Sequence, residues 1–341
     1  MKRILIGAAA VLITFILILF AVTFGAVRIS PDAILSVFTG LFTGETGAGL
    51  HKAQLILLKL RLPRVLLAAI AGAGLGISGA VFQGVFRNPL AEPYLLGVSS
   101  GAALGATLAF VFTFDMVTNV AMGLGGVTIA AFGGAIGSTL LVFFLAGGVN
   151  RDFSFLLLAG IAMSYIFQAV ISFLMMMNRN ELDRIIFWMM GSFSSASWPK
   201  VITSGVFVFI ASLFLILNGR RLNILSLGNQ EAFSLGLDPR KTGLLLLSVA
   251  SLITASVISV SGIIGFVGLL VPHMVRYVTG PDHRKVLPYS ALAGALLLVY
   301  ADLAARTLIP PKEIPIGVIT ALIGGPFFLI QLKFKSWRRG V

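Results

Sequence analysis

The sequence is dominated by apolar runs that are about as long as a membrane is thick. A helix of about 20 residues spans about 30 Å, which matches the hydrocarbon core of a bilayer. Only 11% of the 341 residues are charged, whereas 58% are hydrophobic. We therefore predict an all-α, polytopic membrane protein in which residues 1–341 form a single transmembrane domain. Ten spans are expected, at 4–27, 65–86, 94–112, 120–145, 153–176, 201–217, 243–260, 263–278, 286–306 and 314–334.

The first run, 4–27, follows two basic residues and could be compared with a signal peptide. It is too long for the apolar core of such a peptide and lacks a clear small-x-small cleavage site, so we interpret it as the first span. Ten spans place both termini on one side of the membrane. If that side is the cytoplasm, 15 of the 25 Lys and Arg residues lie inside, in agreement with the positive-inside rule.

Pairs of glycines four residues apart occur in three of the predicted spans. Because glycine has no side chain, this spacing lets helix backbones approach closely in a membrane. We therefore expect these spans to contact neighbouring helices through their glycine faces. The pairs are Gly72 and Gly76, Gly101 and Gly105, and Gly133 and Gly137.

One of the longest polar breaks, at 218–242, lies between the sixth and seventh predicted spans. Within it, Asn229 is a candidate N-cap for a short helix, and Glu231 suits the positive end of that helix. Gly236 is a candidate terminator, and Pro239 would prevent the helix from continuing. We predict a short helix at the membrane surface that docks into a soluble partner; a solvated connector is the alternative. Its apolar face would comprise Ala232, Phe233 and Leu235.

Three arginines lie at the predicted outer ends of spans, against the positive-inside bias: Arg61, Arg64 and Arg306. Positive charges at this position do not help to orient the chain, so they require another explanation. One explanation is the docking of a soluble acidic partner from outside, through charge-assisted pairs with its carboxylates. The alternative is that the arginine side chains extend to lipid phosphates.

Asp302 is the acidic residue that lies deepest in a predicted span. An intramembrane carboxylate is a functional candidate, but Arg306 lies one helical turn further on, so a structural ion pair is an equal alternative. Glu92, in a proline-rich break, is expected to cap the next helix rather than to touch substrate. His273 follows Pro272 inside an apolar run, where a lone histidine is more often a hydrogen-bonded packing residue than a ligand. We treat these residues as structural or pathway candidates.

The sequence lacks the signatures of several enzyme and metal sites. It contains no cysteine and only three histidines, which argues against a metal site in this chain. The patterns GxxxxGK[ST] and HExxH are absent, so we expect neither an ATP site nor a zinc-hydrolase site. The net charge of +13 is explained by basic residues that flank spans rather than by nucleic-acid binding. A transporter of this kind would have to take its energy from a partner.

Five segments of the sequence resemble FecCD-type permeases of bacterial ABC importers, which import iron–siderophore complexes, haem or cobalamin. The resemblance covers nearly the whole chain, in order, and several of its motifs are long and specific. The segments are RLPR (61–64), GAVFQGVFRNPLAEPYLLGVSSGA (79–102), WMMGSFSSASW (188–198), GIIGFVGLLVPHMVR (262–276) and EIPIGVITALIGGPFFLIQL (313–332).

The resemblance implies a type II ABC importer permease of ten helices in the bacterial cytoplasmic membrane, which is not itself an enzyme. It would work as a homodimer or with a similar permease, with two ATP-binding cassette subunits inside and a substrate-binding protein outside. ATP and magnesium would bind only to the partner ATPase, so this chain would need no cofactor. Ferric siderophore is the favoured cargo, and haem and cobalamin are the alternatives.

The resemblance also implies roles for individual residues. The substrate path would lie at the permease–permease interface and be lined largely by the fifth span and its neighbours. The cytoplasmic gate would lie near Gly147, Gly148 and Asn150. The arginines that pair with glutamates of the binding protein would be Arg61, Arg64 and Arg306. The ATPase-coupling residues, all within 218–242, would be Glu231, Ala232, Leu235, Gly236, Asp238 and Arg240.

Two other functional classes remain. A secondary transporter that used Asp302 and Glu92 would run on an ion gradient and need no ATPase, so the ATP dependence of uptake separates it from an importer. An intramembrane enzyme would need a paired acid or a Ser/His site at one depth, and the sequence shows none. Unchanged function after mutation of His273 would remove most of the support for an enzyme.

Overall fold

The computed structural model describes residues 12–14, 16–18, 20–23, 54–112, 124–147 and 153–337. Within these ranges the chain is helical and contains no β-strand, which confirms the all-α prediction. The elements are η1 (Leu55–Arg61), α4 (Leu62–Val85), η2 (Pro93–Leu96), α5 (Val98–Val111), α7 (Gly126–Leu145), α8 (Phe153–Met177), η4 (Arg179–Glu181), α9 (Leu182–Met189), α10 (Trp198–Leu217), α11 (Gly219–Leu227), α12 (Asn229–Ser234), α13 (Pro239–Ser261), α14 (Val267–Thr279), α15 (His283–Thr307) and α16 (Ile316–Trp337).

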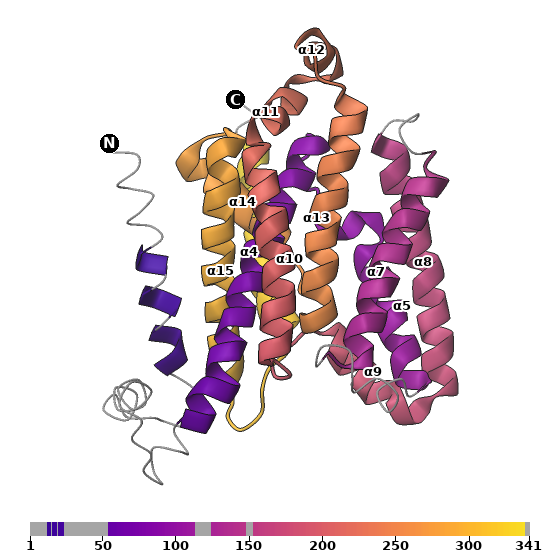
Figure 1. Ribbon diagram of the computed structural model, residues 1–341, viewed down its shortest axis with the longest axis vertical. Coiled ribbons are helices and arrows are strands. Elements are labelled where there is room, and N and C mark those ends of the chain that lie inside the picture. The colour runs from indigo at the N-terminus through magenta and orange to yellow at the C-terminus, as the bar shows by residue number, and fades with distance from the viewer. Residues whose placement is uncertain are drawn as a thin grey trace.

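Helix α4 lies inside the bundle and packs against α10, α13, α14 and α15. A second group, formed by α5, α7 and α8, stands beside it, and α13 contacts both groups (Figure 1). Helices α11 and α12 project at one end of the bundle, whereas α9 lies at the opposite end. We call these the α12 end and the α9 end.

The described helices occupy the positions of all ten predicted spans. Six of them are long and apolar enough to cross a membrane, the first being the continuous helix Leu55–Val85 that joins η1 to α4. Three shorter apolar helices and α14 fall on the other four positions. The predicted span 94–112 is divided, because Gly97 adopts φ 73° and separates η2 from α5. In α14, Pro272 lies inside a helix of only 13 residues.

Glycines of α4 bring its backbone directly against α15 and α14. A Cβ atom at Gly72 would lie 2.0 Å from the carbonyl oxygen of Gly294 in α15, and Gly76 meets α15 in the same way. A Cβ atom at Gly79 would lie 1.8 Å from the carbonyl oxygen of Gly268 in α14. Only a residue without a side chain fits such contacts. The close approach predicted for Gly72 and Gly76 is confirmed.

The contact between α5 and α7 confirms one glycine pair and corrects another. A Cβ atom at Gly101 would lie 2.4 Å from the carbonyl oxygen of Gly134, and one at Gly105 would lie 2.1 Å from another carbonyl oxygen of α7. The close contact predicted for Gly133 and Gly137 was wrong, because a Cβ atom at either position would meet no neighbouring atom of the described chain within 4 Å. Gly134, one residue along, is the glycine that faces α5.

Candidate functional site

The α12 end carries the polar segment 218–242, which folds as α11, α12 and the start of α13. Figure 1 shows α12 projecting beyond the ends of the long helices. Gly228, with φ 142°, occupies the N-cap position of α12. The predicted cap, Asn229, is instead the first helical residue, and its side chain accepts a hydrogen bond from Arg87 at 3.1 Å. The capping prediction for Asn229 was wrong because glycine at 228 adopts a backbone conformation that other residues reach with difficulty.

Glu231 turns back over the start of α12. Its carboxylate oxygen Oε2 lies 2.0 Å from the place where a Cβ atom of residue 228 would stand. The flexible end of this side chain can move aside, whereas φ 142° at residue 228 strains any residue with a side chain, so the start of α12 depends on glycine there. Its negative charge lies in the first turn of the helix, where the helix dipole favours it. Sequence reasoning missed Gly228, although a small residue three positions before a glutamate has the spacing of a capping box.

Large apolar side chains are exposed on α12 and beside it. Ala232 is fully buried, whereas Phe233 and Leu235 are 58% and 61% exposed, and Leu227 at the end of α11 is 64% exposed. The predicted apolar face is therefore divided, with Ala232 packed inward and the two larger residues turned away from the bundle. Exposed apolar groups on a projecting segment are typical of a protein–protein contact.

Gly236 ends α12, and Asp238 begins α13. Gly236 adopts φ 76°, and its amide donates to the carbonyl oxygen of Phe233 at 2.9 Å, which confirms its predicted role as terminator. The side chain of Asp238 accepts hydrogen bonds from the backbone amides of Arg240 and Lys241 at 3.0 and 3.1 Å. A short, hydrogen-bonded turn therefore joins α12 to the long helix α13.

A hollow of about 610 Å³, which several polar and charged residues help to line, lies beside α11, between the end of α4 and the α14–α15 turn. Asn223 organises one wall, because its amide nitrogen donates to Asp282 at 2.7 Å and its oxygen accepts from the backbone amide of His283 at 2.8 Å. The hydrogen bonds from Arg284 and Asn223 lower the pKa of the Asp282 carboxyl well below its usual range. Three basic side chains line the hollow beside this one carboxylate, so positive charge predominates in it. The basic lining residues are Arg87, Arg276 and Lys285.

At the α9 end, Arg64 in the first turn of α4 joins two carboxylates. Its Nε donates to Asp302 of α15 at 2.9 Å, and its Nη1 and Nη2 donate to Glu313 at 2.8 and 3.0 Å. The Asp302 side chain is 1% exposed, whereas that of Glu313 is 42% exposed. Asp302 also forms an ion pair with Arg306 at 3.4 Å, so the structural pair considered for these two residues is present. Sequence reasoning missed Glu313.

Arg61 and Arg306 face into the molecule. Arg306 donates to the carbonyl oxygen of Ala21 at 3.0 Å, and Arg61 donates to that of Thr23 at 2.9 Å. Both residues are buried. These two arginines therefore bind backbone carbonyls of the apolar helix Leu12–Thr23, and the docking role of the three arginines stays a prediction.

The remaining candidates, Pro272, His273 and Glu92, take no part in the ion pairs around Arg64 and Arg306. Pro272 is buried inside α14. The Nε2 atom of His273 lies 3.3 Å from the Tyr277 hydroxyl, and its ring packs edge-on against Phe327, as expected of a packing residue. Glu92 occupies the N-cap position of η2, but its side chain makes no capping hydrogen bond, so the capping role expected for it was wrong. Burial raises the pKa of the Glu92 carboxyl.

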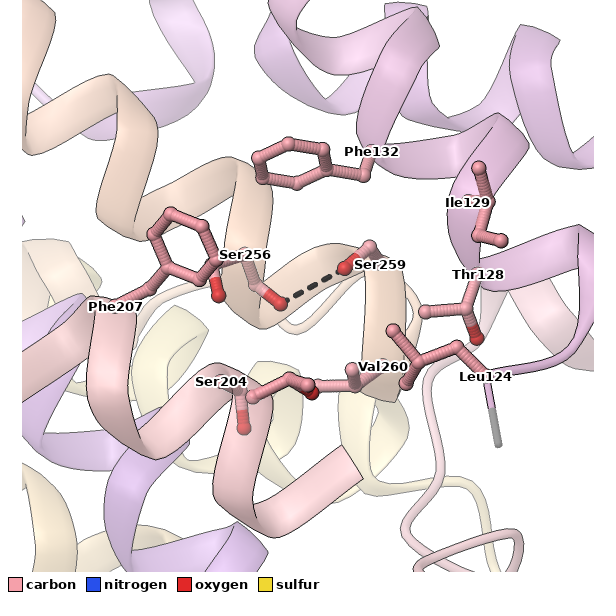
Figure 2. Close-up of a pocket in the computed structure, with 10 residues that line it drawn as sticks. Leu124, Thr128, Ile129, Phe132, Ser204, Phe207, Ser256, Ser259 and Val260 are labelled. Carbon is pink, nitrogen blue, oxygen red and sulfur yellow. Dashed lines mark hydrogen bonds between the residues drawn. The ribbon is translucent and has the colours of Figure 1, made fainter. Parts of the chain in front are cut away.

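A smaller cavity of about 120 Å³ lies between α7, α10 and α13 (Figure 2). Phe132 and Phe207 form part of its wall. The hydroxyl of Ser259 donates to the carbonyl of Ser256 at 2.9 Å, and Ser204 donates to the carbonyl four residues before it at 2.5 Å. Because these hydroxyls bond within their own helices, the cavity presents mainly apolar surface.

The predicted gate is only partly described. Gly147, just after the end of α7, adopts φ 78°. Gly148 and Asn150 lie outside the described residues, so the gate stays a prediction. Within the described ranges, no group of three or more His, Cys, Asp or Glu residues is placed to hold a metal ion.

Comparison with known proteins agrees with this architecture. The FecCD transport family matches residues 13–334. The cobalamin import system permease protein BtuC of Halobacterium salinarum is 44% identical over 84% of this chain and 75% of its own length. The hemin transport system permease protein HmuU of Yersinia pestis is 41% identical over 84% of this chain and 85% of its own. The Fe(3+)-citrate import system permease protein YfmE of Bacillus subtilis is 34% identical over 95% and 93%.

A solved structure has the same fold. It is an inward-facing, metal-chelate type ABC transporter that superimposes with a TM-score of 0.83 at 33% identity, over 96% of this chain and 98% of that one. The family match takes in both the projecting α12 and the arginine network at the α9 end. The resemblance found in the sequence is confirmed, and the chain belongs to the FecCD transport family of ABC importer permeases.

Proposed function

We propose that this chain is the membrane-spanning permease subunit of an importer for an iron–siderophore complex, driven by ATP hydrolysis in partner chains. The names of its relatives support iron chelates as cargo, since they include permeases for Fe(3+)-citrate and iron(3+)-hydroxamate import. Relatives named for hemin and cobalamin make haem and cobalamin the alternatives.

The observation that carries the importer assignment is the form of the α12 end. Helix α12 projects from the bundle, is bounded by Gly228 and Gly236, and exposes Phe233 and Leu235. A soluble ATPase subunit with an apolar groove would bind this tip and move it as a unit. Coupling is assigned to Glu231, Ala232, Leu235, Gly236, Asp238 and Arg240.

Movement of α12 would reach the spans through contacts that the described residues make. The hydrogen bond between Arg87 and Asn229 ties α12 to the end of α4. The hydrogen bond between Asn223 and Asp282 ties α11 to the α14–α15 turn. Closure of two ATPase subunits around ATP would therefore tilt α4, α13 and α15 together, and cargo would gain access to each side of the membrane in turn.

We assign the α12 end and both termini to the cytoplasm and the α9 end to the outside. The arginines of the α9 end, Arg61, Arg64 and Arg306, would then give the outer mouth the positive potential that attracts an acidic substrate-binding protein. A second permease, either a copy of this chain or a similar one, is expected against α8, in which only four of 25 residues are buried. The gate is assigned to the region of Gly147, Gly148 and Asn150.

Reconstitution tests the cargo and the energy source. The chain is placed in lipid vesicles with its ATPase subunits and binding protein, and uptake of a ferric siderophore, hemin and cobalamin is measured with and without ATP. We expect ATP-dependent uptake of the ferric siderophore. Uptake of hemin or cobalamin alone would reassign the cargo, and uptake without ATP would favour an ion-coupled transporter that uses Asp302 and Glu92.

A matched pair of substitutions tests the coupling role of α12. Phe233 and Phe209 are both exposed phenylalanines, at 58% and 70%, but Phe209 lies in the membrane-length helix α10. We expect Phe233→Ala to lower ATP-driven uptake at least tenfold at normal membrane insertion, and Phe209→Ala to change it less than twofold. Equal uptake by the two variants would refute the assignment of coupling to α12.

A further inference from the structure

The guanidinium of Arg64 has one enclosed partner and one exposed partner. Its Nε is held by Asp302, whose side chain is 1% exposed. Its two terminal nitrogens form a two-pronged pair with Glu313, at 2.8 and 3.0 Å, and the Glu313 side chain is 42% exposed. The outward face of Arg64 is therefore occupied by a carboxylate of its own chain.

The two partners of Arg64 differ in how easily they can be replaced. Asp302 is buried between Arg64 and Arg306, and removal of a buried partner leaves cations without compensation. The Glu313 side chain lies partly in solvent, so water can solvate its carboxylate after separation, while Arg64 keeps its ion pair with Asp302. The planar fork of an arginine donates two parallel hydrogen bonds to any carboxylate that approaches it in the same plane. A carboxylate of another protein can therefore take the place of Glu313 and leave Asp302 undisturbed.

The surface around Glu313 suits an acidic protein partner. The turn between α15 and α16, which carries Glu313, also exposes Leu308 and Ile309, whose exposed fractions are 64% and 58%. Apolar groups next to charged ones are typical of protein interfaces. The ion-paired groups, two arginines and two carboxylates, balance in charge, and Arg61, whose charge acts on Arg306, adds one positive charge beside them. This excess favours the approach of an acidic side chain.

We propose that Glu313 is a stand-in carboxylate, which holds Arg64 until an acidic side chain of the substrate-binding protein displaces it. The proposal rests on the importer function above and adds that the affinity for the binding protein is set by competition within this chain. Displacement also frees the α15–α16 turn from α4. Ile314, next to Glu313, donates its amide to Ala305 at 3.0 Å, and Ile316 donates to Gly191 at 3.0 Å. Docking would therefore reach α15, α16 and the α9–α10 loop directly.

The test measures the affinity of the reconstituted transporter, with its ATPase subunits, for the binding protein that supports uptake by the wild-type complex in the same vesicles. Glu313→Gln removes the competing charge, and Glu313→Asp keeps the charge but shortens the side chain. Glu181→Gln is the control, because Glu181 lies at the same end in an ion pair with Arg184 at 2.9 Å and the variant has the same net charge as Glu313→Gln. Arg64→Gln removes the docking cation.

We expect the dissociation constant to fall at least fivefold with Glu313→Gln, to fall less with Glu313→Asp, and to change less than twofold with Glu181→Gln. Arg64→Gln should raise it at least tenfold. The inference is overturned if both Glu313 variants bind like the control or more weakly, or if Arg64→Gln binds like the wild type. If the wild-type complex still shows ATP-driven uptake, either result refutes only the displacement of Glu313 by the binding protein. Absence of ATP-driven uptake by the wild-type complex refutes the importer function itself.

Discussion

Gly79→Ala tests whether the backbone contact between α4 and α14 determines stability. A Cβ atom at residue 79 would stand 1.8 Å from the carbonyl oxygen of Gly268, whereas non-bonded heavy atoms are favourably placed at about 3.5 Å. The two helices would have to separate by about 1.7 Å, the difference between these distances. Such a separation would also loosen the adjoining contact of Gly72 and Gly76 with α15.

The cost of this separation can be placed at about 3 kcal/mol, the upper end of the range for overpacked cores. At about 2–4 °C per kcal/mol for a large domain, the midpoint of thermal unfolding should fall by roughly 6–12 °C. Gly133→Ala is the matched control, because the same methyl group in α7 would meet no neighbouring atom of the described chain within 4 Å. A substitution into open space should change the free energy of unfolding by less than about 0.5 kcal/mol.

Both variants are purified in the same detergent, and unfolding is followed by tryptophan fluorescence after size-exclusion chromatography. The reasoning is refuted if Gly79→Ala unfolds within about 2 °C of Gly133→Ala, since this is less than the shift expected for 1 kcal/mol. Failure to recover folded Gly79→Ala, alongside a normal yield of Gly133→Ala, counts as destabilisation of the predicted sign.

Three further predictions concern single substitutions. Gly228→Ala should reduce co-purification of the ATPase subunits at normal membrane insertion, because φ 142° at residue 228 strains alanine and would shift the start of α12; unchanged co-purification would contradict it. Asp302→Ala should lower the free energy of unfolding by about 3–5 kcal/mol, because Arg64 and Arg306 lose a buried partner; an unchanged midpoint of thermal unfolding would show that the ion pairs do not stabilise the fold. Glu92→Gln should raise the unfolding midpoint at about pH 8. Burial raises the pKa of Glu92, so its ionisation costs stability above the folded-state pKa, and this cost disappears as the pH falls through that pKa. The gain should therefore shrink towards about pH 5, and a gain that does not depend on pH would rule out this explanation.

The positions of the spans could be predicted because the length of an apolar run is a local property of the sequence. Helix α8, Phe153–Met177, was expected at 153–176. Helix α13 begins at Pro239, four residues before the predicted 243, because Asp238 caps a polar first turn that apolar length cannot detect. The pair of Asp302 and Arg306 could likewise be predicted from the sequence, since residues four apart lie on one face of a helix.

Contacts between distant segments could not be predicted in the same way. Arg64 and Glu313 are 249 residues apart, and Arg87 and Asn229 are 142 apart. Each of these pairs requires knowledge of which helices are neighbours, and a single sequence does not contain it. The glycines of α7 show the same limit, because the four-residue spacing of Gly133 and Gly137 identifies a face of the helix without showing what covers that face.

Helix α4 connects the two ends of the molecule that carry the candidate functional residues. Arg64 lies in its first turn and Arg87 just beyond its last, and its 24 residues span about 36 Å at about 1.5 Å per residue. Helix α15 packs against α4 where Gly72 meets Gly294, and it places Asp302 against Arg64. Because backbone meets backbone there, little deformable side chain separates the two helices, and they should move as one body. A pull on α12, transmitted through Arg87, would then move Arg64 and Asp302 together at the far end, so a change at either end of the molecule would reach the other.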